Sequence, residues 1–290
     1  MLIFLYIILA LAIFFVFVDV VDINRFITRE YNIESKKIDG DIKLVVLADM
    51  HNKQFGKENY KLINAIRDIN PDAIICAGDM LTAKPGKDYT PALNLFTYLK
   101  DYPVYYGMGN HEYRMDIYRD KYGDKYDEYA KALSELGVHI LYNASEKVSF
   151  GSTGVKSDIC IQGLAIDKRF YKRFERCEMD AAYIESEIGK RDENLFDIMI
   201  AHNPEYFPAY AEYGSDLVLS GHVHGGIMRL PILGGVISPK LSLFPRFDGG
   251  LFDHKETKMV LSRGLGCHTL PLRIFNPGEL VVVNLHPCQK

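Results

Sequence analysis

The sequence predicts an α/β protein that follows an N-terminal apolar helix. Short apolar runs of strand length recur along the chain, segments with helical periodicity alternate with them, and the first eighteen residues carry no charged side chain. The composition, 48% hydrophobic and 25% charged over 290 residues, is that of a globular protein with a sizeable core. The alternation by itself favours a single, doubly wound sheet.

The N-terminal stretch MLIFLYIILALAIFFVFV predicts a membrane anchor. As a helix it would extend roughly 27 Å at about 1.5 Å per residue, close to the hydrocarbon thickness of a bilayer. A cleaved signal peptide would carry a basic segment and a cleavage site with small residues, whereas Asp19 and Asp22 follow here directly. We therefore expect an uncleaved, single-pass transmembrane helix at residues 1–20 that places the protein in the cell membrane.

The residues after this helix predict a polar connector at 21–41 and one catalytic domain at 42–288. Arg25 and Arg29 follow the helix and no basic residue precedes it, which by the positive-inside rule favours a cytoplasmic domain. Asp19, Asp22 and Glu30 are interleaved with these arginines. The sequence leaves the side of the membrane open.

Eight apolar runs are the predicted strands of this domain. A helical stripe of Leu62, Ile63, Ile66 and Ile69 separates the first two runs and ends at Asn70, before a proline. A further helix is expected at residues 129–136. The predicted strands are residues 43–48, 73–77, 104–107, 159–163, 197–201, 217–220, 259–262 and 280–285.

Five of these strands end just before polar side chains that can bind metal ions. In an open α/β sheet, ligands bind at the carboxyl ends of the strands, so we expect these side chains to converge. Carboxylate, amide and imidazole groups together suit Mn, Fe or Zn better than Ca or Mg. The seven predicted ligands are Asp49, His51, Asp79, Asn110, His202, His222 and His224.

Two cations about 3.5–4 Å apart need a ligand that contacts both. Asp79 is the candidate, because it has two carboxylate oxygens and lies on a glycine turn. In the segment SGHVHGG, the surrounding glycines would allow His222 and His224 to turn toward the same pair of ions, one histidine for each.

Charge and cysteine content exclude other classes of protein. The net charge of −4 lacks the basic surface of a nucleic-acid-binding protein, so no nucleic acid partner is expected. The five cysteines form no CxxC pair and no disulfide spacing, and we interpret them as free thiols.

Five short motifs contain these ligands: Asp49-Met50-His51, Gly78-Asp79, Gly109-Asn110-His111-Glu112, His202 and Gly221-His222-Val223-His224. In their order along the chain, they resemble the signature of the calcineurin-like metallophosphoesterases: D-x-H, G-D, G-N-H-[DE], H and G-H-x-H. The resemblance covers residues 42–286. The segments GGIMRLPILGG and LSRGLGCHTLPLRIFNPGEL are most similar to bacterial membrane-anchored members, those related to cell-wall-associated and UDP-diacylglucosamine-hydrolysing phosphoesterases. The resemblance implies a four-layer αββα sandwich of two mixed sheets instead of a single sheet.

The resemblance also implies a role for each motif residue. Asp49, His51 and His224 would hold one divalent cation, Asn110, His202 and His222 the other, and Asp79 would bridge them. Manganese is the favoured metal. Two such cations would lower the pKa of a shared water from about 15.7 towards roughly 7 and so supply a hydroxide nucleophile for attack on phosphorus. His111 would contact the substrate phosphate or protonate the leaving group.

Two departures from family patterns disfavour particular subfamilies. Protein phosphatases of this group continue the bridging aspartate as D-R-G, whereas Asp79 is followed here by Met80 and Leu81. Purple acid phosphatases need a tyrosine three residues after that aspartate, where this chain has Thr82.

We therefore predict a phosphoesterase that hydrolyses a phosphodiester or pyrophosphate bond of a phosphorylated small molecule or lipid. A lipid, a nucleotide-sugar and a cell-envelope molecule are the favoured substrates. Two alternatives stay open: a cyclic-nucleotide phosphodiesterase, which would share every metal ligand, and a membrane-tethered interaction module that is stabilised by metal and is not an enzyme. His268 and Arg273 lie where they could reach a substrate. The sequence does not indicate the oligomeric state.

Overall fold

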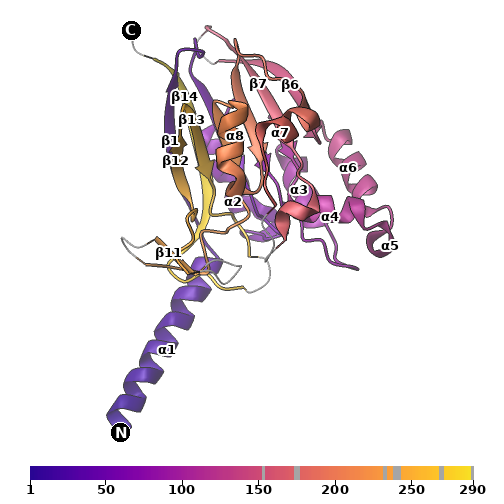
Figure 1. Cartoon of the computed structure of the whole chain (residues 1–290). Helices are drawn as coiled ribbons and strands as arrows, with labels where there is room; N and C mark the ends of the chain where they lie inside the picture. Colours follow the sequence, from indigo (N-terminus) through magenta and orange to yellow (C-terminus); the bar gives the residue numbers. More distant parts are fainter. Residues whose placement is uncertain (152–153, 173–176, 231–233, 238–242, 268–270, 289–290) are drawn as a thin grey trace.

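Two six-stranded sheets pack face to face, and a long N-terminal helix projects from one end of them (Figure 1). The structure is a computed structural model that describes residues 1–151, 154–172, 177–230, 234–237, 243–267 and 271–288. His268, which we expected near the substrate, lies outside these residues.

The first sheet has the strand order β1-β14-β2-β3-β4-β5. Strand β1 is parallel to β14, β14 is antiparallel to β2, and the remaining pairs are parallel. The bounds are β1 (Phe26–Ser35), β2 (Ile42–Leu47), β3 (Ala73–Ala77), β4 (Val104–Gly107), β5 (Val138–Leu141) and β14 (Gly278–Pro287).

The second sheet has the order β12-β13-β9-β8-β7-β6, with parallel pairs in the middle and an antiparallel pair at each edge. A two-stranded ribbon, β10-β11, lies apart from both sheets. The bounds are β6 (Ala144–Phe150), β7 (Ser157–Leu164), β8 (Phe196–Ala201), β9 (Leu217–Ser220), β10 (Met228–Leu230), β11 (Gly234–Ile237), β12 (Gly250–His254) and β13 (Thr257–Leu261).

Helices cover the outer face of each sheet. The helices over the first sheet are α2 (Tyr60–Ile69), α3 (Thr90–Tyr98), α4 (Asn110–Ile117), α5 (Arg119–Tyr122) and α6 (Lys125–Glu135), and those over the second are α7 (Ala181–Ile188) and α8 (Phe207–Tyr213). The single-turn helices are η1 (Lys57–Asn59), η2 (Lys168–Tyr171) and η3 (Pro204–Tyr206). The predicted stripe on α2 is confirmed: Leu62, Ile63 and Ile66 are buried, and the helix ends at Asn70 in a left-handed conformation with φ 48°.

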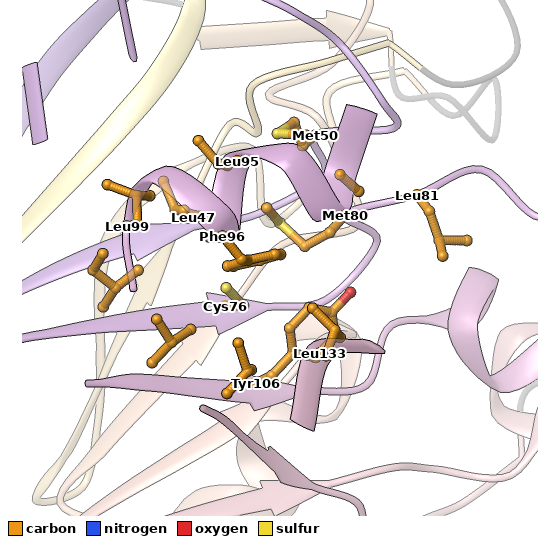
Figure 2. Close-up of a cluster of buried hydrophobic side chains, with 14 of the residues drawn as sticks. Leu47, Met50, Cys76, Met80, Leu81, Leu95, Phe96, Leu99, Tyr106 and Leu133 are labelled. Carbon is orange, nitrogen blue, oxygen red and sulfur yellow. The ribbon is translucent and has the colours of Figure 1, made fainter. Parts of the chain in front are cut away.

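The central strands of both sheets, such as β3, β8 and β9, are mainly apolar because both of their faces are buried. Between the sheets, Leu44 and Ile75 belong to the same core cluster as Ile198 and Leu219. On the outer face of the first sheet, Phe96 of α3 lies over Cys76 of β3 (Figure 2). The layers are therefore helix, sheet, sheet, helix. The αββα sandwich is confirmed, and the single doubly wound sheet that periodicity favoured is wrong.

The region expected to be a connector, residues 21–41, contains a strand. Strand β1 pairs along its whole length with β14, from Phe26 opposite Gly278 to Ser35 opposite Pro287. As an edge strand of a two-faced sheet, it alternates between half-buried and exposed side chains, which is why its sequence looks polar. Helix α1 (Leu2–Ile23) precedes it and is the one helix, within the described residues, that is long and apolar enough to cross a membrane.

Candidate metal centre

The two sheets bring the five predicted strand ends to one place. Strands β2, β3 and β4 come from the first sheet, and β8 and β9 from the second. Glycine is needed where they meet: a Cβ on Gly78, which has φ +89°, would lie 2.6 Å from the backbone of Gly109 and 2.8 Å from Nδ1 of His202. The side chains therefore converge as predicted, but from two sheets instead of one.

Asp49, His51 and His224 form one group of potential metal ligands. Their ligand atoms lie within 4.8 Å of one another. The Nε2 atoms of His51 and His224 are 3.3 Å apart, and Asp49 Oδ1 is 3.8 Å from the first and 3.4 Å from the second. All three residues have positive φ, between 49° and 53°, a backbone conformation that bulky residues adopt at a cost and that is typical of functional sites.

Asp79, His202 and His222 form a second group with the same compactness. Nε2 of His202 lies 3.2 Å from Asp79 Oδ2. The side-chain oxygen of Asn110 faces two acceptor atoms, Nδ1 of His222 at 2.9 Å and Asp79 Oδ2 at 3.3 Å. Rotating this amide would satisfy the hydrogen bonds of a cation-free site. The orientation with oxygen inward is the one that a cation between these atoms would select.

Two buried atoms in the centre face charged neighbours: Asp49 Oδ1 has no hydrogen-bond partner in the described part of the chain, and His202 Nε2 lies 3.2 Å from Asp79 Oδ2. The other ends of both side chains are fixed, since Asp49 Oδ2 accepts from the backbone N–H of His222 at 2.8 Å and His202 Nδ1 donates to the carbonyl of Ala77 at 2.6 Å. A buried polar atom without a partner is costly. Asp49 Oδ1, and His202 Nε2 once it has lost its proton, would each present a lone pair to a cation. The donor set therefore fits divalent metal ions.

The electrostatics of the centre point the same way. Burial raises the pKa of Asp49 to about 7. Burial opposes the charged form of His202, but the carboxylates of Asp79 and Asp49 outweigh it and raise the pKa of His202 to about 10. For His224, burial and the guanidinium of Arg273 hold the pKa well below its usual value, so this ring is a neutral ligand. Because burial disfavours their charged forms, the carboxylates of Asp49 and Asp79 are stabilised by positive charge beside them.

His111 lies beside the two groups, with Nε2 4.0 Å from Asp79 Oδ2. The backbone N–H of Ala83 donates to its Nδ1 at 2.8 Å, so a neutral His111 carries its proton on Nε2, the nitrogen that faces the centre. This tautomer can donate a proton or a hydrogen bond to a bound phosphate.

The sequence profile of the calcineurin-like phosphoesterases matches residues 42–226, more than half of the chain. The chain belongs to this family. The resemblance carried by the five motifs is thereby confirmed.

Curated relatives of this phosphoesterase include membrane proteins. An uncharacterized metallophosphoesterase of Campylobacter jejuni is 29% identical over 96% of this chain, and UDP-2,3-diacylglucosamine pyrophosphatase LpxG of Chlamydia muridarum is 22% identical over 83% of it. A transmembrane protein with a metallophosphoesterase domain from Danio rerio is 25% identical over 84%. The chain spans 69%, 83% and 53% of the lengths of these three relatives, and 64% of a metallophosphoesterase of Helicobacter pylori.

Glu112 also belongs to the site of this phosphoesterase, although sequence reasoning assigned it no role. Its carboxylate is fully buried and accepts from the backbone N–H groups of Asp79 at 3.0 Å, Met80 at 2.9 Å and Gly109 at 3.1 Å, and from the hydroxyl of Tyr106 at 2.7 Å. It thus joins the turns that carry Asp79 and Asn110. Its position as the last residue of the G-N-H-E motif was the sequence feature that could have indicated this role.

Arg273 does not reach a substrate as we expected. It is 2% exposed, and its guanidinium donates to the carbonyls of Arg263, Gly264, Gly266 and Asn276. The side chain is thus held inside the protein by carbonyls of the loop between β13 and β14. Asn276 supports the site from the same loop, since its Nδ2 donates to the carbonyl of His224 at 2.8 Å.

Proposed function

We propose that the protein is a membrane-anchored phosphoesterase that uses two divalent cations to hydrolyse a phosphodiester or pyrophosphate bond. The observation that carries this proposal is that the two ligand groups adjoin at Asp79, whose Oδ2 lies 3.2 Å from Nε2 of His202 and 3.9 Å from Nε2 of His51. Asp49 Oδ1 is buried beside them and has no hydrogen-bond partner among the described residues. A site for one structural ion would not need ligands on both sides of a shared carboxylate.

Each residue has a role in this proposal. Asp49, His51 and His224 would hold one cation, Asn110, His202 and His222 would hold the other, and Asp79 would contact both. When bound, the pair supplies a hydroxide nucleophile near neutral pH and neutralises negative charge on the phosphate. His111 binds the phosphate or gives its Nε2 proton to the leaving oxygen, and Ala83 keeps that proton on the correct nitrogen. Mn is the metal to test first, ahead of Fe and Zn.

The relatives support a lipid-linked substrate. The Chlamydia protein is named for a pyrophosphate bond in a diacylated molecule, and the Danio relative is named as a transmembrane protein. An apolar α1 agrees with both names. We therefore place lipid pyrophosphates first among the substrates, ahead of nucleotide-sugars and cyclic nucleotides.

The test has two stages. Metal analysis and hydrolysis of bis-p-nitrophenyl phosphate in Mn separate an enzyme from an interaction module: two bound ions per chain and Mn-dependent turnover are expected, and bound metal with no turnover would favour the module. A panel of lipid pyrophosphates against cyclic nucleotides then identifies the substrate class. Faster turnover of cyclic nucleotides would contradict the lipid assignment while leaving the two-cation chemistry intact.

A further inference from the structure

Helix α1 is hydrogen-bonded to the catalytic domain at its last turn. Asp19 Oδ1 accepts from the backbone N–H of Arg273 at 2.6 Å, and Asp22 Oδ2 accepts from the backbone N–H of Asn276 at 3.0 Å. Asp22 is only 2% exposed, although most of the apolar residues before it are exposed. These contacts fix the direction in which the helix leaves the domain, so α1 is not a flexible tether.

The loop that receives α1 also supports the metal centre. The guanidinium of Arg273 donates to the carbonyl of Gly266, which in turn accepts from Nδ1 of His224 at 3.1 Å. Asn276 contacts both the helix, through its backbone N–H, and the carbonyl of His224, through its side chain. One hydrogen-bonded residue, Asn276, therefore connects Asp22 of the helix to the predicted metal ligand His224. Two such residues, Arg273 and Gly266, connect Asp19 to the same ligand.

Strand directions place the metal centre at the end of the domain from which α1 emerges. Strand β1 starts at Phe26, directly after α1, and runs antiparallel to β2 because it is parallel to β14. The start of β1 and the carboxyl ends of β2, β3 and β4 therefore lie at the same end. Figure 1 shows α1 leaving this end and the C-terminus at the opposite one.

Exposed apolar side chains lie in the loops at the end of the domain from which the helix emerges. Four of them lie in the loops after β11 and before β14, and we call them the apolar rim: Leu243, Phe244, Leu272 and Phe275, which are 67%, 59%, 38% and 40% exposed. Large apolar side chains grouped in this way mark an interaction surface and are not typical of an ordinary surface loop.

Backbone hydrogen bonds place the two loops of the apolar rim in one structure. Ile227 donates to Ile237 of β11 at 2.7 Å and accepts from Ile274 at 3.2 Å, while Phe244 donates to Val236 at 2.9 Å. Figure 1 shows β11 near the end of α1 that joins the catalytic domain.

The apolar rim is continuous with the apolar surface of α1. The ring of Phe275 lies 6.3 Å from the rings of both Phe14 and Phe15, and Phe14 is 49% exposed. Phe244 and Phe275 have φ values of 47° and 54°, where asparagine or glycine would be less strained. A strained backbone that presents an aromatic ring outward suggests a use for that ring.

We propose that the lipid bilayer covers the apolar rim, and that α1 and the rim together hold the metal centre against the membrane surface. Because Phe275 contacts the helix beside Phe14, it must enter the medium that surrounds the helix, which favours lipid over a second protein chain. The proposal rests on α1 being the membrane anchor, and it narrows the proposed function to substrates whose phosphate lies in the headgroup layer.

Basic side chains at the same level agree with a headgroup environment. Arg25 lies two residues after α1, pairs with Asp22 at 2.7 Å and keeps 53% of its side chain exposed. Lys53 donates to the side chain of Asn24 at 2.9 Å. Positively charged side chains beside a membrane span are attracted to anionic lipid headgroups.

Tryptophan fluorescence tests this proposal, because the chain contains no tryptophan. The variants Phe244→Trp and Phe275→Trp each add a single fluorophore to the apolar rim. The matched control is Val155→Trp, because Val155 is 50% exposed and precedes β7, whose start lies at the other end of the sheets. Each full-length variant is placed in vesicles of phosphatidylcholine and phosphatidylglycerol with brominated acyl chains, which quench tryptophan on contact.

We expect at least a twofold loss of fluorescence at positions 244 and 275, and little loss at 155. Quenching at 244 that is no stronger than at 155 would overturn the proposal, as would a blue-shifted, unquenched tryptophan, which would indicate a protein partner over the rim. Flotation of the same vesicles tests membrane anchoring separately. A chain that fails to float would overturn both the anchoring by α1 and the burial of the apolar rim in the bilayer. Hydrolysis of bis-p-nitrophenyl phosphate by the same variants reports whether the two-cation function holds independently.

Discussion

Asp79 determines whether the centre acts as one unit. Its Oδ1 accepts from the backbone N–H of His111 at 2.7 Å, and its Oδ2 faces Nε2 of His202. Burial opposes its charge, but His202 and His111 outweigh burial and hold the pKa of Asp79 well below its usual range. The carboxylate is therefore ionised and available to cations.

The variant Asp79→Asn should abolish Mn-dependent hydrolysis, because an amide supplies one oxygen where the proposal needs two. We expect at least a thousand-fold loss of kcat for bis-p-nitrophenyl phosphate, about 4 kcal/mol of transition-state stabilisation. The exposed Asp101→Asn serves as the control and should keep full activity. Persistent turnover in Asp79→Asn would show that this residue does not bridge two ions.

His111→Asn tests proton donation. Asparagine can still accept from Ala83, so the fold should be kept while the Nε2 proton is lost. General acid catalysis contributes about 10²–10⁴-fold, most for poor leaving groups that need a proton. The variant should therefore lose much more activity on an alkyl phosphodiester than on a p-nitrophenyl ester. An equal loss on both would assign His111 to phosphate binding instead.

Glu112→Gln tests the buried support of the two turns. The substitution places an amide N–H₂ among donors that now share a carboxylate, and each donor left without an acceptor costs about 1–3 kcal/mol. We expect the free energy of unfolding to fall by at least about 2 kcal/mol, measured by thermal or denaturant unfolding. Glu135→Gln, at a side chain that is 68% exposed, should change little.

At the scale of elements, the last turn of α1 and the loop before β14 form one unit. In Asp22→Ala, the backbone N–H of Asn276 loses its acceptor, and the carbonyl of His224 is held less firmly. A loss of about 1.4 kcal/mol in cation binding would raise the Mn concentration for half-maximal activity roughly tenfold.

The matched control for this element is Asp41→Ala, a side chain that is 59% exposed at the start of β2. Its pair with His286 is a surface contact worth about 0–1 kcal/mol, so the Mn dependence should stay unchanged. Identical Mn titrations for Asp22→Ala and the unaltered chain would show that the anchor does not support the centre.

Most strands could be predicted from the sequence, because a strand buried on both faces is an uninterrupted apolar run. Residues 73–77, 104–107 and 217–220 were predicted with the bounds that the structure has. Strand β1 was missed, because an edge strand with one solvated side resembles a connector. Its partner β14 lies about 250 residues away, a pairing that no local pattern reveals.

At the scale of the whole molecule, the cations should stabilise the fold. A ligand that binds only the native state adds about 2.7 kcal/mol when its free concentration is 100 times its Kd. Removing metal with EDTA should therefore lower the Tm by several degrees, and added Mn should restore it. In Asp79→Asn, the same treatments should change the Tm less than in the unaltered chain. A Tm that ignores both EDTA and Mn would contradict a folded-state metal centre.

The division into two sheets shows where sequence reasoning ends. The strand ends that carry Asp79 and His202 were expected together, and they are, but alternation of strands and helices cannot tell one sheet from two stacked sheets. Family resemblance supplied the sandwich. The roles of Glu112, Asn276 and Arg273 depend on buried contacts between distant loops, and only coordinates reveal those.

Anomalous scattering from Mn-soaked crystals tests the central claim most directly. The account predicts two peaks about 3.5–4 Å apart, one beside Asp49, His51 and His224 and the other beside Asn110, His202 and His222, with Asp79 between them. A single peak, or none at these side chains, would contradict it.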